Sequence, residues 1–129
     1  MPAARELSIL IVDDQQTMRA LAKSCLNQIG VLRVADAADG KAAFNRMLQQ
    51  RYDVVICDWI MPDMDGLTLL GQVRKNAALK ATPFIMASAH SAKDKIQLAL
   101  AAGANVYVQK PFKPADLKGA IESIVGKLN

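Results

Sequence analysis

The sequence alternates between short apolar runs and segments with helical periodicity, and this alternation repeats five times along 129 residues. The apolar runs occupy Leu7–Val12, Leu32–Ala35, Val54–Cys57, Phe84–Ala87 and Val106–Val108. In the segments that follow, apolar residues recur at intervals of three and four, which is the spacing of one face of an α-helix. Strands that alternate with helices favour a parallel sheet covered by helices on both faces. The pattern therefore predicts one α/β domain of the (βα)5 type.

The composition of the runs predicts the place of each strand in the sheet. The first, third and fourth runs are almost wholly apolar, as expected of strands that are buried on both faces. The second strand, placed at Val31–Val34, contains Arg33, and the fifth strand, placed at Asn105–Gln109, alternates polar and apolar residues. The second and fifth strands are therefore predicted at the edges.

Several residues predict where helices begin and end. Gly30 follows the first helical segment, as is typical of a residue just past a helix end. Ser91 and Asp94 have the spacing of a capping box, which predicts that the fourth helix opens at Ser91. Pro114 suits the first turn of the last helix, whose apolar periodicity continues to Leu128.

The composition, 52% hydrophobic and 22% charged, is that of a folded domain and excludes several functions. No apolar stretch approaches the roughly 18 residues of a membrane helix, and the N-terminus fits an export signal poorly. We therefore expect a cytoplasmic protein without membrane insertion. The net charge of +4 is spread along the chain without a nucleic-acid-binding motif, so direct DNA binding is not expected. Cys25 and Cys57 lie in apolar segments and are predicted to be buried thiols.

Polar residues stand at the carboxyl ends of four predicted strands. Asp13 and Asp14 follow the first strand, and Asp58 follows the third. Ser88 follows the fourth strand, and Lys110 follows the fifth. Because ligands of such sheets bind at the carboxyl ends of the strands, we expect these side chains to form one site.

The residue types at these ends favour phosphoryl chemistry with a divalent cation. Three neighbouring carboxylates repel one another, and Mg²⁺ relieves the repulsion while keeping positions for water and phosphate oxygens. Lys110 supplies a positive charge for a phosphate, and Ser88 supplies a hydrogen bond. A carboxylate beside a metal can also act as a nucleophile toward phosphorus.

Five motifs in order along the chain resemble the receiver domain of two-component response regulators. They are VDD at 12–14, DWIMPDMDG at 58–66, Ser88-Ala89, Tyr107 and KPF at 110–112. The resemblance covers essentially the whole chain and is strongest toward CheY-like single-domain regulators of chemotaxis. It implies a doubly wound, flavodoxin-like sheet of order 2-1-3-4-5, and a single receiver domain over residues 1–129 with no output domain.

The resemblance implies a role for each acid of the site. Asp58 would accept the phosphoryl group. Asp13, Asp14, Asp58 and the backbone carbonyl of Ile60 would bind Mg²⁺.

The other motif residues would respond to the phosphoryl group. Lys110 would contact it, and Ser88 would donate a hydrogen bond to it. Tyr107 would change rotamer together with Ser88 and alter the face made by the fourth helix, the fifth strand and the fifth helix. The Lys110–Pro111 peptide bond is expected to be cis.

Four further positions in or near the motifs are not expected to bind the phosphoryl group or to bind Mg²⁺ through their side chains. Ile60 stands two residues after the acceptor, where relatives often carry a polar residue, and His90 stands two residues after Ser88, where an acid is frequent. Both are expected to border the path of the attacking water, so they are candidates for tuning the lifetime of the phosphorylated state. Asp63 is interpreted as a turn residue, and Asp65 as the cap of the third helix.

The resemblance implies a monomeric signalling phosphoacceptor rather than an enzyme. Its partners would be a CheA-like histidine kinase and a phosphorylation-dependent target such as a flagellar switch protein. A phosphorelay shuttle and a phosphate sink remain alternatives. A haloacid-dehalogenase-type phosphatase is disfavoured because Ile60 stands where that class needs a general acid. An FMN carrier is disfavoured because the loop after the first strand is acidic.

Overall fold

The computed structural model describes residues 3–89 and 92–129, in which five parallel strands form one sheet. The strands are β1 (Ser8–Val12), β2 (Arg33–Ala37), β3 (Val54–Asp58), β4 (Phe84–Ser88) and β5 (Val106–Gln109). The helices are α1 (Gln16–Gln28), α2 (Gly40–Gln49), α3 (Gly66–Lys75), α4 (Lys93–Ala101) and α5 (Pro114–Val125), and a short 3-10 helix, η1 (Ala4–Glu6), precedes β1. The strand order β2-β1-β3-β4-β5 confirms the predicted fold, with β2 and β5 at the edges.

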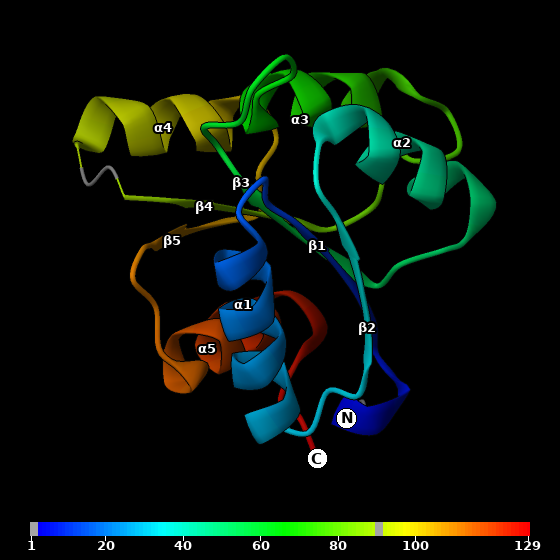
Figure 1. The fold of residues 1–129 in the computed structure, drawn as a ribbon, viewed down its shortest axis with the longest axis vertical. Helices are drawn as coiled ribbons and strands as arrows, with labels where there is room; N and C mark the ends of the chain where they lie inside the picture. Colours follow the sequence, from blue (N-terminus) through cyan, green and yellow to red (C-terminus); the bar gives the residue numbers. More distant parts are fainter. Residues whose placement is uncertain (1–2, 90–91) are drawn as a thin grey trace.

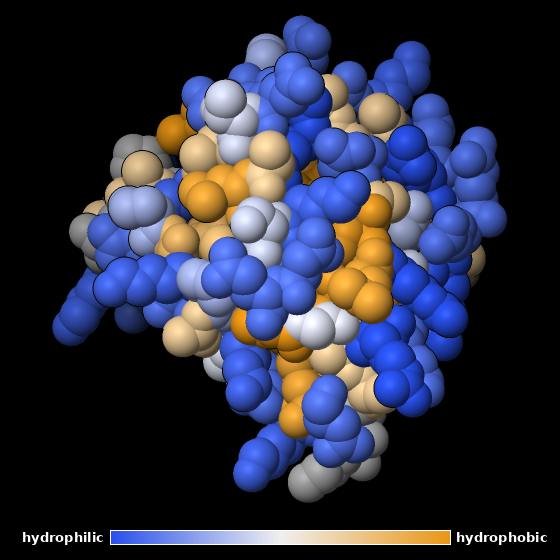
Figure 2. Space-filling view, turned by 60° about the horizontal axis from the view of Figure 1, so that its bottom comes forward, coloured by the Kyte–Doolittle hydropathy of each residue, from blue (hydrophilic) through white to orange (hydrophobic). Residues whose placement is uncertain are grey.

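The helices form two layers around the sheet. Helices α1 and α5 cover one face, and α2, α3 and α4 cover the other (Figure 1). Alternate residues of the central strands therefore enter separate cores: on β1, Ile9 and Ile11 pack toward α1 and α5, whereas Leu10 and Val12 pack toward α2 and α3. Figure 2 brings the α1 and α5 side forward and shows a mostly hydrophilic surface broken by apolar patches. Among the described residues, no helix is long and apolar enough to cross a membrane.

The predicted start of the second strand is wrong, because Val31 and Leu32 precede β2. The N–H of Val31 donates to the carbonyl of Leu26 at 2.9 Å, and Gly30 adopts a positive φ of 94°. This is a Schellman motif, in which a hydrophobic residue beyond the glycine packs back on the helix. Val31 is therefore buried as the end of α1 rather than as the start of the strand.

The predicted end of the last helix is also wrong. Helix α5 ends at Val125, and Gly126 turns the chain with a φ of 93°. The N–H of Leu128 then donates to the carboxylate of Glu122 at 2.9 Å, and the leucine side chain is buried. The apolar periodicity continues past the helix because the tail folds back onto the same core.

The starts of three helices show where side-chain caps are used. Asp39 and Asp65 cap α2 and α3 by accepting hydrogen bonds of 2.7 and 2.8 Å from backbone N–H groups, as interpreted for Asp65. Helix α4 begins at Lys93 after Ala92, which makes no side-chain cap, so the predicted start at Ser91 is wrong. Ser91 itself lies outside the described residues. Helix α4 thus lacks one of the contacts that fix α2 and α3.

Candidate functional site

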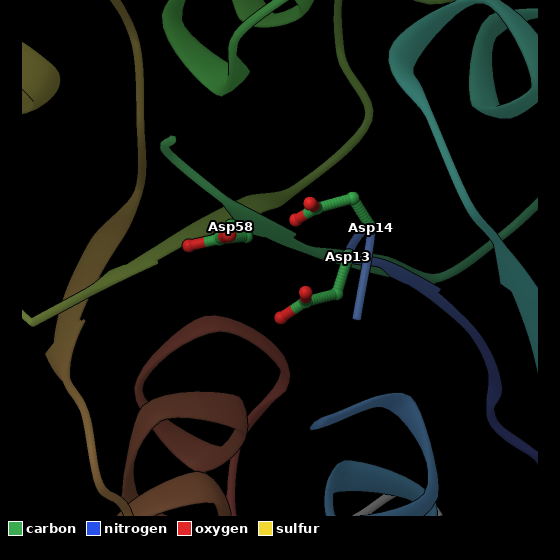
Figure 3. A group of neighbouring side chains, drawn as sticks. All are labelled: Asp13, Asp14 and Asp58. Atoms are coloured by element: carbon green, nitrogen blue, oxygen red, sulfur yellow. The ribbon is translucent and has the colours of Figure 1, made fainter. Parts of the chain in front are cut away.

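The three acids predicted from the strand ends come together at the carboxyl edge of the sheet. Strands β1 and β3 are neighbours, and their register pairs Val12 with Cys57. The next residue of each strand is therefore an aspartate, Asp13 beside Asp58. One carboxylate oxygen from each of Asp13, Asp14 and Asp58 lies within 4.8 Å of the others. Figure 3 shows these side chains close together, with Asp13 and Asp14 at the end of β1 and Asp58 at the end of β3.

Lys110 joins two of these acids. Its Nζ lies 2.7 Å from Oδ2 of Asp13 and 3.1 Å from Oδ1 of Asp58. The side chains of all three residues are 14% exposed or less, so the ion pairs lie largely out of water. The backbone N–H of Lys110 donates to the carbonyl of Ser88 at 2.8 Å, and the Lys110–Pro111 peptide bond is cis. The lysine is thus anchored by its backbone as well as by its charge.

Burial and charge act on the site in opposite directions. Burial raises the pKa of Asp58, the charge of Lys110 partly opposes this rise, and the neighbouring Asp13 and Asp14 raise the pKa further. Burial lowers the pKa of Lys110, but its contacts with Asp13 and Asp58 outweigh that effect, so the pKa of Lys110 is raised. Lys110 therefore stays charged at neutral pH, and ionisation of Asp58 is costly in the absence of a further cation.

A glycine allows the loop after β3 to close tightly against Asp58. The N–H of Gly66 donates to the carbonyl of Trp59 at 2.7 Å. A Cβ at position 66 would clash with the carbonyl oxygen of Asp58, so a larger residue would displace the backbone of the acid. Asp63, interpreted as a turn residue, has a φ of 67°, a left-handed conformation that aspartate tolerates.

An open pocket lies over the acids. Its lining consists of Asp14, Gln15, Asp58, Ile60, Met61, Pro62, Ser88, Ala89 and Lys110. The structure thus brings predicted residues from the ends of four strands, together with the β3–α3 loop, around one space. The Ile60 side chain is 62% exposed at this pocket and presents an apolar surface to it. His90, the other predicted rate-tuning residue, lies outside the described residues.

Trp59, the residue after Asp58, contacts the predicted switch residue Tyr107 and a lysine of α4. Its ring meets that of Tyr107 on β5 edge to face, with centroids 6.4 Å apart. The Nζ of Lys95 on α4 lies 5.6 Å from the centroid of the Trp59 ring, which is a cation–π contact. Ser88 is buried at the end of β4. Sequence reasoning missed the Lys95 contact, because nothing in the local pattern of α4 specifies it.

Sequence reasoning also missed Arg19, although it lies in the VDDQQTMR segment. Its guanidinium donates a 2.7 Å hydrogen bond to the backbone carbonyl of Asp13. The available signal was its position, six residues after Asp13 in the first turn of α1.

Comparisons with known proteins identify relatives of this chain in sequence and in fold. The response regulator receiver domain family matches residues 9–122. The chemotaxis protein CheY of Pseudomonas aeruginosa is 41% identical over 95% of this chain and 99% of its own length. The solved structure of Vibrio cholerae CheY4 covers 96% of this chain and 99% of its own, with a TM-score of 0.84 and 31% identity. The receiver domain of a Pseudomonas aeruginosa sensor histidine kinase, solved with a magnesium ion coordinated in its active site cleft, covers 94% of this chain and 98% of its own, with a TM-score of 0.84 and 30% identity.

The raised pKa of Asp58 predicts that Asp58→Asn stabilises the metal-free protein at neutral pH. Between the ordinary aspartate pKa of 3.8 and the raised value, the folded state binds more protons than the unfolded state, so the stability of the wild type falls as pH rises. The variant lacks this titration, and Lys110 keeps its contact with Asp13. We therefore expect its advantage to be small near pH 3.8 and to grow as pH rises through the raised pKa.

Thermal unfolding in a chelating buffer measures this difference, since about 1 kcal/mol shifts the Tm of a domain of this size by about 4 °C. Asp63→Asn is the matched control, because Asp63 is exposed and Asn also tolerates its left-handed conformation. An Asp58→Asn protein no more stable than the wild type at pH 7 would contradict the burial argument.

Proposed function

The chain belongs to the response regulator receiver domain family, and from this we propose that Asp58 accepts a phosphoryl group from a histidine kinase and that the modified protein changes its binding to a target. The single observation that carries the proposal is the position of Asp58. It ends a buried central strand, lies beside two further acids and contacts the ammonium of a largely buried lysine. The relatives named for chemotaxis connect the family match to two-component signal transduction.

The donor set fits the magnesium ion that receiver domains bind in an acidic pocket. Three carboxylates are hard oxygen ligands, and Mg²⁺ favours such ligands together with water and phosphate oxygens. Asp13, Asp14 and Asp58 would hold the ion together with the backbone carbonyl of Ile60. The bound ion would neutralise negative charge on the acids and on the phosphoryl oxygens.

The chain's own residues then account for acceptance of the phosphoryl group. A carboxylate oxygen of Asp58 attacks phosphorus, and the bond from phosphorus to the donor breaks as the donor leaves with its electron pair. Lys110, held in place by Asp13, turns its ammonium from the Asp58 carboxylate to a phosphoryl oxygen. Ser88, buried at the end of β4, donates a hydrogen bond to another oxygen. Asp58 is itself modified, so the protein acts as a signalling phosphoacceptor rather than as an enzyme.

We propose that Ser88 and Tyr107 relay the change to the surface made by α4, β5 and α5. Ser88 pairs with Gln109 on β5, two residues beyond Tyr107. The Tyr107 ring packs against Trp59, the residue after the acceptor, so a shift at Ser88 has a short route to Tyr107. Helix α4 is suited to move, because Ala99 is its only buried residue and Ala92, at its N-cap, provides no side-chain hydrogen bond. Phosphorylation adds about −1.5 to −2 charges, enough to form new charge-assisted hydrogen bonds in the pocket.

The target is proposed to be a protein of the flagellar switch, with a CheA-like kinase as the donor. Relatives named as chemotaxis proteins, with 37–41% identity over nearly the full chain, favour this over a phosphorelay shuttle or a phosphate sink. The Lys93, Lys95, Lys113 and Lys118 ammonium groups on α4 and α5 or at their starts would favour an acidic segment on the target.

Acetyl phosphate with Mg²⁺ is expected to add one phosphoryl group to the wild type and to Asp63→Asn, and none to Asp58→Asn. Asp63 is the matched control because it lies in the same loop, five residues beyond Asp58, with its side chain exposed. Intact-protein mass spectrometry measures the label, and chelation of Mg²⁺ should prevent it.

Labelling of Asp58→Asn to the wild-type extent would refute the acceptor assignment.

The relay is tested on the wild-type protein with a phosphoryl analogue. Binding of the analogue at the site should change the nuclear magnetic resonance signals of the Tyr107 ring. An analogue that binds and leaves those signals unchanged would show that Tyr107 does not respond.

Ile60 is expected to prolong the phosphorylated state. Its exposed side chain at the pocket cannot orient an attacking water, whereas the amide of Ile60→Asn can. One positioned hydrogen bond of about 1.4 kcal/mol corresponds to a roughly ten-fold faster loss of phosphate. The decay of the labelled protein after removal of the donor measures this rate.

Leu48→Asn is the control for the Ile60 variant. Leu48 is also an exposed apolar residue, but it lies in the last turn of α2, at the amino edge of the sheet. Equal decay rates for Ile60→Asn and the wild type would exclude Ile60 as a determinant of lifetime.

Partner assays distinguish motor control from a relay. With a stable phosphoryl analogue on Asp58, the purified protein is expected to bind a purified flagellar switch protein at least ten-fold more tightly than without it, on the scale of typical allosteric coupling. Calorimetric titration measures both affinities. Transfer of the phosphoryl group to a histidine phosphotransfer protein, without any switch-protein binding, would instead identify a shuttle.

A further inference from the structure

Arg19 connects the first acid of the site to the edge strand β2. Its Nη1 donates to the backbone carbonyl of Asp13 at 2.7 Å, and its Nε donates to Oδ2 of Asp36 at 3.0 Å. The Arg19 side chain is only 17% exposed, whereas that of Asp36 is 56% exposed. The guanidinium therefore lies against the β1–α1 loop, anchored from β2.

The contact with Arg19 completes a set that holds Asp13 at each of its polar atoms. The Asp13 N–H donates to the carbonyl of Ala37 at 3.1 Å. Its Oδ1 accepts from the N–H of Gln15 at 2.9 Å, and its Oδ2 accepts from Lys110 at 2.7 Å. Within this set, Arg19 holds the carbonyl of Asp13 through a side chain to which the proposed phosphoryl chemistry gives no role.

That carbonyl belongs to the peptide unit between the two adjacent acids. A peptide unit is planar, so the orientation of the Asp13 carbonyl also sets the direction of the Asp14 N–H and Cα. Rotation of this unit would swing the Asp14 carboxylate relative to that of Asp13. A hydrogen bond from Arg19 restrains this rotation and so restrains the separation of two of the three carboxylates.

The charge of Arg19 acts in the opposite direction. A guanidinium near the site repels a divalent cation, so removal of its charge alone would strengthen cation binding. Asp36 offsets part of that repulsion through its ion pair with Arg19. When Arg19 is replaced by an uncharged residue, loss of positioning should therefore weaken Mg²⁺ binding, whereas loss of the charge should strengthen it.

We propose that Arg19 is a positioning residue for the Mg²⁺ site, which it serves by fixing the peptide unit between Asp13 and Asp14. This inference rests on the proposed function, because it assumes that these acids bind Mg²⁺. Residues that do not touch a metal ion but hydrogen-bond to its ligands typically contribute ten- to hundred-fold to metal affinity.

The test is a Mg²⁺ titration of the full chain at constant ionic strength, with Trp59 fluorescence as the readout. Trp59 is the only tryptophan of the sequence and adjoins Asp58, so its emission reports binding without phosphorylation. Arg19→Ala is expected to raise the Kd for Mg²⁺ about ten-fold. Lys23→Ala, the matched control, removes a positive charge one turn later, in the groove that Arg19 also lines, and should leave the Kd unchanged or slightly lower.

Three more variants separate positioning from folding and from charge. Arg19→Lys keeps the charge but replaces the two donor nitrogens of Arg19 with a single ammonium, and should give a Kd between those of the wild type and Arg19→Ala. Asp36→Ala should weaken binding in the wild type and have little further effect in Arg19→Ala, because it acts through the arginine. Thermal unfolding without Mg²⁺ reports the stability of each protein separately.

Each outcome decides between these explanations. A higher Kd for Mg²⁺ in Arg19→Ala supports positioning if Arg19→Lys partly reverses the rise and Lys23→Ala does not show it. An unchanged or lower Kd for both Arg19→Ala and Lys23→Ala overturns it, whatever the stability of the variants. A wild type whose acids bind no Mg²⁺ in this titration would overturn the metal site of the proposed function and this inference with it.

Discussion

The contact of the Lys110 ammonium with Asp13 and Asp58 is the interaction on which the site depends. Three carboxylates at the edge of an apolar sheet would repel one another, and burial adds to the cost of the Asp13 and Asp58 charges. One lysine offsets two of these charges at 2.7 and 3.1 Å. The lysine is 97 residues from Asp13 and follows β5, so the site is complete only when β5 has joined the sheet. The site is therefore a product of the tertiary fold rather than of any local segment.

Lys110 leaves the site only partly neutralised, and this incomplete compensation connects stability with function. The pKa of Asp58 remains raised by burial and by the neighbouring acids despite the lysine. A group that binds at the acids and adds positive charge relieves this cost, so the metal-free protein favours cation binding. The partly neutralised acids thus lower the stability of the metal-free fold at the carboxyl edge of the sheet, while the two apolar cores on either side of the sheet hold the strands in place. Such a division is typical of functional sites.

Periodicity was sufficient to predict the order of elements, the edge strands and the strand ends that carry the acids, since those features repeat along the chain. It misplaced the start of β2 and the end of α5, because Val31 and Leu128 are apolar residues that pack outside the regular elements. Burial alone does not reveal backbone conformation. Periodicity also gave no indication of the roles of Arg19 and Lys95, because their contacts join elements that only the tertiary fold brings together. Site residues on strand ends are predictable from local pattern, whereas those that act across elements are not.

The two cations that contact Asp13 differ in chemistry as their proposed tasks require. The guanidinium of Arg19 is planar and presents donors in fixed directions, which suits a residue that holds a carbonyl and a carboxylate at the same time. The ammonium of Lys110 is a compact charge on a flexible stem, and it can exchange one oxygen for another without losing its contact with Asp13. With lysine at position 19, a flexible ammonium would replace the group that fixes the Asp13 carbonyl. With arginine at position 110, a rigid guanidinium would replace the group that must exchange one oxygen partner for another. The arrangement therefore fixes the backbone of Asp13 from the α1 side and leaves the side facing Asp58 free to respond.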